Sequence, residues 1–302
     1  MSKLSENEIL KLCSKNIGVA FYFYQKPSVI KENIKYVISE YHKIANAKMN
    51  FFMFNDGKMK NMRGKIFPQY AYISIDNYDF NNSFCVHFYN DSKEKCHDYA
   101  VEMYLSDFDS EKYFSSKMPN ILYFEFSITT DLSDIYFFIK KAFDSINFFY
   151  VFCNPVISGN LLYYPKSFNL AVRQLKNNII FAPKQGHFTH SFEFYLQNHM
   201  VGATNLIQFF SNEFKEYIFE NSDLLNNIPE NIFLKEYINC FSFSLLNFKN
   251  DNEKIYFYDI QSVLLEKYKI LNAILQNIIT YDYGKHMFFK KDDWQNWTTR
   301  FE

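Results

Sequence analysis

The segment GHFTHSFEFYLQNH is the strongest candidate for a metal site in this sequence. It contains His187, His190 and His199, with Glu193 between them. On a helix, His187 and His190 would share a face and Glu193 would follow one turn later. Zinc binds to His and carboxylate ligands, but the His-Glu-x-x-His arrangement is missing. Histidines of a polar loop or sheet are the alternative, and we expect no metal or other cofactor.

The stretch KCHDY places a thiol, an imidazole and a carboxylate in succession at Cys96, His97 and Asp98. If the stretch is a strand, adjacent side chains point to opposite faces, so Cys96 and His97 would not form a nucleophile and base pair. We therefore expect no enzyme. The rival hypothesis is a metal-dependent enzyme or small-ligand-binding protein whose site is assembled across the fold from Cys96 and the segment above: His187, His190 and Glu193.

Two charged loops are candidates for contact with a partner protein. SDFDSE supplies Asp107, Asp109 and Glu111 at alternate positions, as at the start of a calcium loop, but the required glycine and final glutamate are missing, which favours a solvated acidic loop. GKMKNMRGK gathers basic residues that suit phosphate or an acidic partner, with an ordinary exposed loop as the alternative. These residues are Lys58, Lys60, Arg63 and Lys65.

The elements that would position these residues follow a strand–helix–strand pattern three times. In each unit a helical spacing of apolar residues lies between two strand-like runs, which is typical of a β-α-β unit. The strand runs are 18–25 and 50–54, then 121–128 and 148–153, then 254–260 and 286–289. Thr130 or Asp131 is expected to cap the second helix and Asp259 the third.

The sequence thus predicts an α+β protein with amphipathic helices on one face of a mostly antiparallel sheet. A hairpin is expected across the turn at 90–95, and the run 236–247 is expected to pair with 254–260. We predict two related ferredoxin-like halves, residues 1–160 and 161–302, with one continuous domain as the alternative.

Composition excludes several classes of protein. The 302 residues are 48% hydrophobic and 21% aromatic, with a formal charge of −1, so a dedicated nucleic-acid binder is disfavoured. Only 7 glycines are present and none form Gly-x-Gly, so the usual phosphate-binding loops are excluded. Five unpaired-looking cysteines, no signal-like start and no long apolar run predict a cytoplasmic protein without a membrane span.

The C-terminal stretch DDWQNWTTRFE contains both tryptophans of the protein. Its spacing Trp297-x-x-Arg300-Phe301 resembles the closing motif of a family of bacterial type VI secretion immunity proteins. The order of segments is also similar, including a glycine-containing stretch, VGATNLIQFFSNEF. Its matching residues are Gly202, Asn205 and Leu206.

The resemblance implies a protein of interbacterial competition that binds a cognate toxin and neutralises it by stoichiometric occlusion. It also implies that Trp294 and Trp297 are docked against the sheet, with Arg300 near a carboxylate; a partner-binding tail is the alternative. The expected partner is the toxin, with no nucleic acid and no membrane. The sequence leaves the oligomeric state open, a homo-oligomer included.

Overall fold

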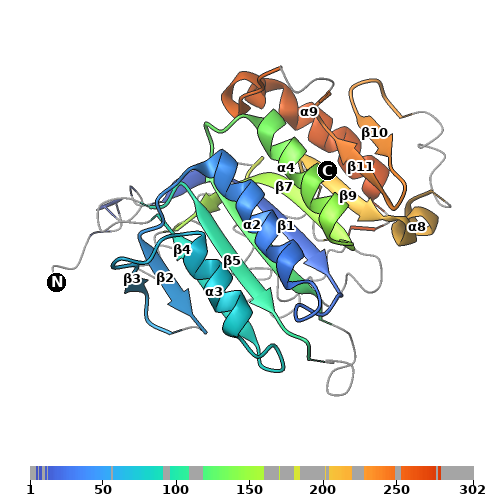
Figure 1. The fold of residues 1–302 in the computed structure, drawn as a ribbon. Helices are drawn as coiled ribbons and strands as arrows, with labels where there is room; N and C mark the ends of the chain where they lie inside the picture. Colours follow the sequence, from blue (N-terminus) through green and yellow to red (C-terminus); the bar gives the residue numbers. More distant parts are fainter. Residues whose placement is uncertain are drawn as a thin grey trace.

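The computed structural model describes residues 5, 7–8, 11, 13–55, 57–90, 96–108, 118–159, 170, 180–183, 201, 204–219, 228–248, 253–276 and 278–279. Within them the chain forms an eleven-stranded sheet, with helices packed against it (Figure 1). Apart from one parallel pairing, of β7 with β8, the paired strands are antiparallel. The predicted α+β class is confirmed.

The strand order is β10-β11-β9-β7-β1-β6-β5-β4-β2-β3, with β8 beside β7. The strands are β1 (Ser14–Phe23), β2 (Phe51–Phe54), β3 (Lys60–Asn61), β4 (Phe84–Tyr89), β5 (Ala100–Leu105), β6 (Asn120–Ser127), β7 (Tyr150–Ser158), β8 (Ala182–Pro183), β9 (Ile207–Ser211), β10 (Phe233–Glu236) and β11 (Cys240–Ser244). The helices are α2 (Lys31–Ala45), α3 (Gln69–Asn77), α4 (Leu132–Ser145), η3 (Asn212–Phe214), α8 (Lys215–Phe219) and α9 (Phe257–Leu275).

The first two predicted β-α-β units are present. β6 and β7 both pair antiparallel with β1, so they run parallel to each other on either side of it, and α4 makes the crossover between them. α2 connects β1 to β2 in the same sheet. As expected, Asp131 caps α4, its side chain accepting from the Ser133 amide at 2.9 Å. The predicted hairpin is formed by β4 and β5.

Helices α2, α3 and α4 lie on one face of the sheet (Figure 1). In α2, Ile34, Val37, Ile38 and Tyr41 recur at helical spacing and are fully buried, which gives the helix its inward face. Aromatic rings fill the layer between: Phe21 of β1 meets Phe124 of β6 at 5.7 Å and Phe138 of α4 at 5.6 Å, both edge-to-face. Tyr41 of α2 lies 5.0 Å from Phe124.

The opposite face of the sheet is more polar but also buried. On β7, Asn154 is fully buried and accepts hydrogen bonds from the Tyr268 hydroxyl of α9 and from the Leu206 amide at 3.0 Å. Asn205, singled out by the family resemblance, donates from Nδ2 to the Tyr150 hydroxyl at 3.3 Å. This face therefore joins α9 and the segment before β9 to the centre of the sheet.

The third predicted unit is wrong in its first strand. Residues 257–260 begin α9, and Tyr256 occupies the N-cap position without a side-chain cap hydrogen bond. Asp259 therefore lies in the first turn of the helix and not at the cap. Phe257, Leu264 and Leu271 are spaced seven apart and fully buried, so the helical face extends back into the aromatic run that was read as a strand.

The pairing predicted for 236–247 is also wrong, because its expected partner is helical. β11 pairs instead with β9 and β10. The strand predicted at 286–289 lies outside the described residues. Strands from both predicted halves, 1–160 and 161–302, belong to one sheet, and the division into two halves stays a prediction.

Candidate functional site

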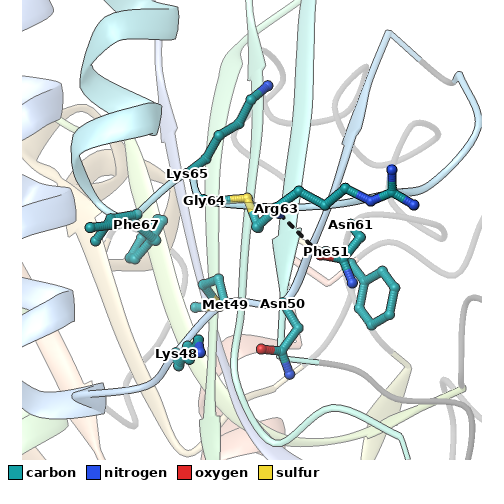
Figure 2. A pocket seen from close by; sticks show the side chains of 11 residues that line it. Lys48, Met49, Asn50, Phe51, Asn61, Arg63, Gly64, Lys65 and Phe67 are labelled. Atoms are coloured by element: carbon teal, nitrogen blue, oxygen red, sulfur yellow. Dashed lines mark hydrogen bonds between the residues drawn. The ribbon is translucent and has the colours of Figure 1, made fainter.

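A hollow of about 590 Å³ opens where the β2–β3 hairpin meets the loop that leads to α3 (Figure 2). Its lining includes Lys48 before β2 and the turn after β3, with Arg63, Gly64 and Lys65. The basic loop found in the sequence thus forms part of a concave surface. Among the described strands β3 pairs with β2 alone, so this surface lies at one edge of the described sheet.

The turn at the rim has an uncommon backbone. Arg63 has φ of 27° and Gly64 has φ of 75°, and the Lys65 amide donates to the Met62 carbonyl at 2.9 Å. Two successive positive φ values in a four-residue turn are those of a type I′ turn, which favours Gly, Asn or Asp at both positions. The Arg63 amide donates to the Asn61 side chain at 3.0 Å (Figure 2). An arginine at this position is costly and carries its guanidinium at the tip of the turn.

The cations at this edge are exposed. Lys65 lies over the Tyr70 ring at 3.9 Å and the Phe52 ring at 4.5 Å, so its direction is fixed by aromatic contacts. The other four cations at this edge are Lys48, Lys58, Lys60 and Arg63. Within the described part of the chain, none of these four forms an ion pair. Of these four, Lys48 and Arg63 line the hollow, which therefore places beside the type I′ turn cations that lack an ion pair with any described residue.

The acidic candidates are placed differently. Asp107 is half-buried; its side chain accepts from the Ser28 amide at 3.1 Å and its own amide donates to the Phe80 carbonyl at 2.8 Å. These bonds give Asp107 a structural role in joining loops. Asp109 and Glu111 lie outside the described residues, so a contact of this loop with a partner stays a prediction.

Two further groups of predicted residues lie outside the described part of the chain. The first is the metal candidate, with its histidines and glutamate: His187, His190, His199 and Glu193. The second is the C-terminal signature: Trp294, Trp297, Arg300 and Phe301. Among the described residues, no group of three or more His, Cys, Asp or Glu side chains is arranged to hold a metal ion.

A buried polar network lies on the sheet face opposite α2 and α4. The Glu125 carboxylate on β6 is fully buried and accepts from Asn16 Nδ2 at 2.6 Å, Ser158 Oγ at 2.8 Å and His97 Nε2 at 2.9 Å. The Tyr123 hydroxyl donates to it at 3.0 Å. These donors come from β1, β6, β7 and the segment before β5, so the carboxylate links the central strands.

A second row of polar side chains follows on β4 and β5. Cys85 Sγ lies 3.0 Å from His87 Nε2, and His87 Nδ1 lies 2.8 Å from the Tyr89 hydroxyl. Tyr89 donates to Glu102 Oε1 at 2.8 Å, and His87 Nδ1 lies 3.6 Å from Glu102 Oε2. Sequence reasoning missed this row. Its signal was Cys85, His87 and Tyr89 at alternate positions of a predicted strand, where side chains share a face.

The expectation for Cys96 and His97 was wrong. Both precede β5, which begins at Ala100, and Cys96 Sγ lies 3.6 Å from His97 Nδ1. The strand rule that separates adjacent side chains does not apply outside a strand. Cys96 is buried and its thiol donates to the Ser158 carbonyl at 3.5 Å.

The described residues contain no helix long and apolar enough to cross a membrane. Among solved structures, the fold resembles that of the Pseudomonas aeruginosa T6SS protein PA0821, with a TM-score of 0.67. The likeness covers 95% of this chain and 82% of that chain, at 10% sequence identity, and it concerns the fold. No protein-family model matches the sequence, and no curated protein matches it.

Proposed function

We propose that this protein is a cytoplasmic immunity protein associated with type VI secretion, which binds a cognate toxin and blocks it by occlusion without catalysis. The observation that carries the proposal is the cationic hollow at the β3 edge, with its exposed cations and its costly Arg63. The fold shared with a T6SS protein and the C-terminal spacing that resembles immunity proteins support the same function.

In this proposal the toxin presents an acidic surface to the hollow. Lys60 and Arg63 steer the approach of the toxin, since complementary charge raises association rates. Ile66 lines the same hollow with 69% of its surface exposed, and it provides an apolar anchor beside the cations. The aromatic contacts of Lys65 and the hydrogen bonds of the turn hold the surface in place before binding, which lowers the entropic cost of association.

The proposal is tested with the protein encoded by the adjacent gene, since an immunity gene is expected beside its toxin. The two proteins are co-purified, and affinity is measured by calorimetry at low and high salt. We expect a one-to-one complex that weakens as salt rises, because exposed charges are screened. Growth of cells that express the toxin should depend on the presence of this protein.

A charge-reversal triple variant locates the surface: Lys58→Glu, Lys60→Glu and Arg63→Glu. The matched control reverses three exposed lysines elsewhere and changes the formal charge by the same amount: Lys26→Glu, Lys140→Glu and Lys254→Glu. The first variant should lose binding and protection while remaining folded, and the control should keep both. A stable complex that tolerates the first variant would refute the hollow as the binding surface, and the absence of any complex would refute the function.

A further inference from the structure

The row of side chains on β4 and β5 is not used by the proposed toxin-binding surface. Cys85 and His87 share a face of β4, and Glu102 lies directly opposite His87 on β5. These three side chains place a thiol, an imidazole and a carboxylate side by side in space. A nucleophile beside a base, with the base oriented by a third group, is the arrangement that activates side chains in covalent chemistry.

The hydrogen bonds determine which nitrogen of His87 carries the proton. Burial, reinforced by the charge of Glu102, raises the pKa of Tyr89 far above its usual range, so its hydroxyl keeps its proton. That proton is donated to Glu102 Oε1, because an ionised carboxylate only accepts. The Tyr89 oxygen must therefore accept from His87 Nδ1. With Nδ1 used as a donor to Tyr89, Nε2 is the ring nitrogen that faces the Cys85 thiol.

We propose that Cys85 is a nucleophilic thiol, activated by proton transfer to His87 and by the stabilisation of the resulting imidazolium by Glu102. The Sγ–Nε2 distance of 3.0 Å places the base within hydrogen-bond reach of the thiol proton. Glu102 acts on Nδ1 both directly, at 3.6 Å, and through the Tyr89 hydroxyl. His87 is 1% exposed, so water does not compete for its contacts.

The reagent class is a small hydroperoxide, because Cys85 is only partly exposed and a compact electrophile reaches it most readily. The thiolate sulfur attacks one oxygen of the peroxide and the O–O bond breaks. The leaving hydroxide of hydrogen peroxide, or alkoxide of an organic hydroperoxide, takes the proton from His87 and departs as water or alcohol. Sulfur is oxidised to a sulfenic acid and the peroxide is reduced, so one molecule of peroxide is consumed for each thiol modified.

The chain contains its own control thiol. Cys13 is also partly exposed, but burial, with a contribution from nearby Cys96, raises the pKa of its thiol to about 12. Cys13 is therefore protonated at neutral pH and unreactive. The remaining cysteines are buried: Cys96, Cys153 and Cys240. Reactivity at Cys85 can be compared with reactivity at Cys13 in the same molecule.

The experiment treats the full-length protein with hydrogen peroxide in the presence of dimedone, and labelling at each cysteine is followed by mass spectrometry from pH 5.5 to 9. At pH 7 we expect Cys85 to be labelled roughly tenfold or more faster than Cys13. Its rate should already be high at pH 6, whereas an ordinary thiol gains rate up to about pH 8.5. An ordinary profile for Cys85, or a rate no higher than that of Cys13, would overturn the proposal.

His87→Asn should lower Cys85 labelling roughly tenfold at pH 6 and much less at pH 9, where the thiol ionises unaided. The matched control is His42→Asn, which removes a half-buried imidazole of α2, on the other face of the sheet, whose ring lies 5.5 Å from that of Phe67. The control should leave the Cys85 profile unchanged, and equal losses in both variants would show that labelling follows only the fold.

Tyr89→Phe and Glu102→Gln test the relay without removing the base. Other titratable groups also face this row: His97 beside Tyr89, Tyr104, whose hydroxyl donates to Glu102 Oε2 at 3.2 Å, Tyr123, opposite Glu102 on β6, and Glu125, whose charge contributes to the raised pKa of Tyr89. We expect Glu102→Gln to move the labelling profile toward higher pH, because the imidazolium loses its counter-charge. If the His87 variant does not fold, the profile of the unchanged protein decides the proposal by itself.

Discussion

The hydroxyl oxygen of Tyr123 lies 2.7 Å from the position that a Cβ atom would take on Gly18. Val156 Cγ1 lies 2.9 Å from the same position. A glycine at this position of β1 leaves room for the Tyr123 ring to extend over the strand. The Tyr123 hydroxyl then donates to Glu125 at 3.0 Å. We expect Gly18→Ala to lower the free energy of unfolding by roughly 1–3 kcal/mol, the usual cost of an overpacked core, as measured by urea denaturation.

A double-mutant cycle identifies the source of this cost. Tyr123→Phe removes the hydroxyl that the new methyl group would meet, so the two substitutions together should be less destabilising than the sum of the single effects. Strict additivity would show that Gly18 and Tyr123 do not compete for the same space. The cycle also tests whether the central strands keep their register without this contact.

Glu40 should contribute stability that depends on pH. It lies on α2 and accepts from Lys43 and, at 2.9 Å, from Lys141 on α4. Burial alone would raise the pKa of Glu40, but the two lysines outweigh it and hold that pKa below its usual range. The contribution is therefore complete above the unfolded pKa of about 4.3 and is lost as the pH falls through the folded pKa.

Replacing Glu40 with Gln should lower the free energy of unfolding at pH 7 by roughly 1 kcal/mol, since both lysines are largely exposed. The difference between the two proteins should shrink in acid, as the native carboxyl becomes protonated and resembles the amide. Denaturation at pH 7 and at pH 3 checks this. A difference that persists unchanged at pH 3 would assign the effect to packing.

Arg63→Gly should stabilise the protein while weakening its complex with the toxin. Glycine relieves the left-handed backbone at φ of 27°, where other L-residues cost roughly 1–2 kcal/mol. The melting temperature should rise slightly and affinity should fall. Gly64→Ala, with a φ of 75° and open space around it, is the control that makes the turn less stable without removing charge. If the Arg63→Gly protein binds the toxin with normal affinity, the strained backbone at Arg63 does not serve toxin binding.

Asn154 should be needed for cooperative unfolding. Its side chain holds the Leu206 amide and the Tyr268 hydroxyl, and Asn154→Ala leaves both donors without this acceptor, at a cost of roughly 2–4 kcal/mol. Tyr268→Phe removes one bond and should cost about 1 kcal/mol. Because one sheet includes strands from 1–160 and 161–302, we expect the unchanged protein to unfold in one transition. Two separated transitions would support independent halves.

Periodicity predicted the elements whose burial pattern is unambiguous. In α2, Ile34, Val37, Ile38 and Tyr41 follow a helical face, and the structure buries all four. In contrast, seven residues at 254–260 were too few to distinguish a strand from the start of a helix, which in the structure packs its first residue, Phe257, on Phe181 at 5.5 Å.

The candidate sites, like the elements, could be predicted from local sequence only in part. The basic loop was visible because its charges lie within one short stretch of sequence, but the hollow also includes Lys48, which comes from a separate segment. The Cys85 row requires two strands in a defined register, with His87 opposite Glu102. Registers between strands depend on tertiary packing, and local spacing does not specify them. The alternation of Cys85 and His87 was the one part that the sequence contained.

The central position of β1 has a consequence for how the protein is made. Its two hydrogen-bonding edges are filled by β6 and β7, and the later of these strands ends at Ser158. At ribosomal rates of 5–20 residues per second, the chain from Phe23 to Ser158 takes roughly 7–27 s to synthesise. The aromatic strand has no partner in the sheet until β6 is complete at Ser127, and it lacks its second partner until β7 is complete at Ser158. Newly made protein should therefore depend on chaperones that hold nascent chains, and slowing translation within this region should lower its soluble yield.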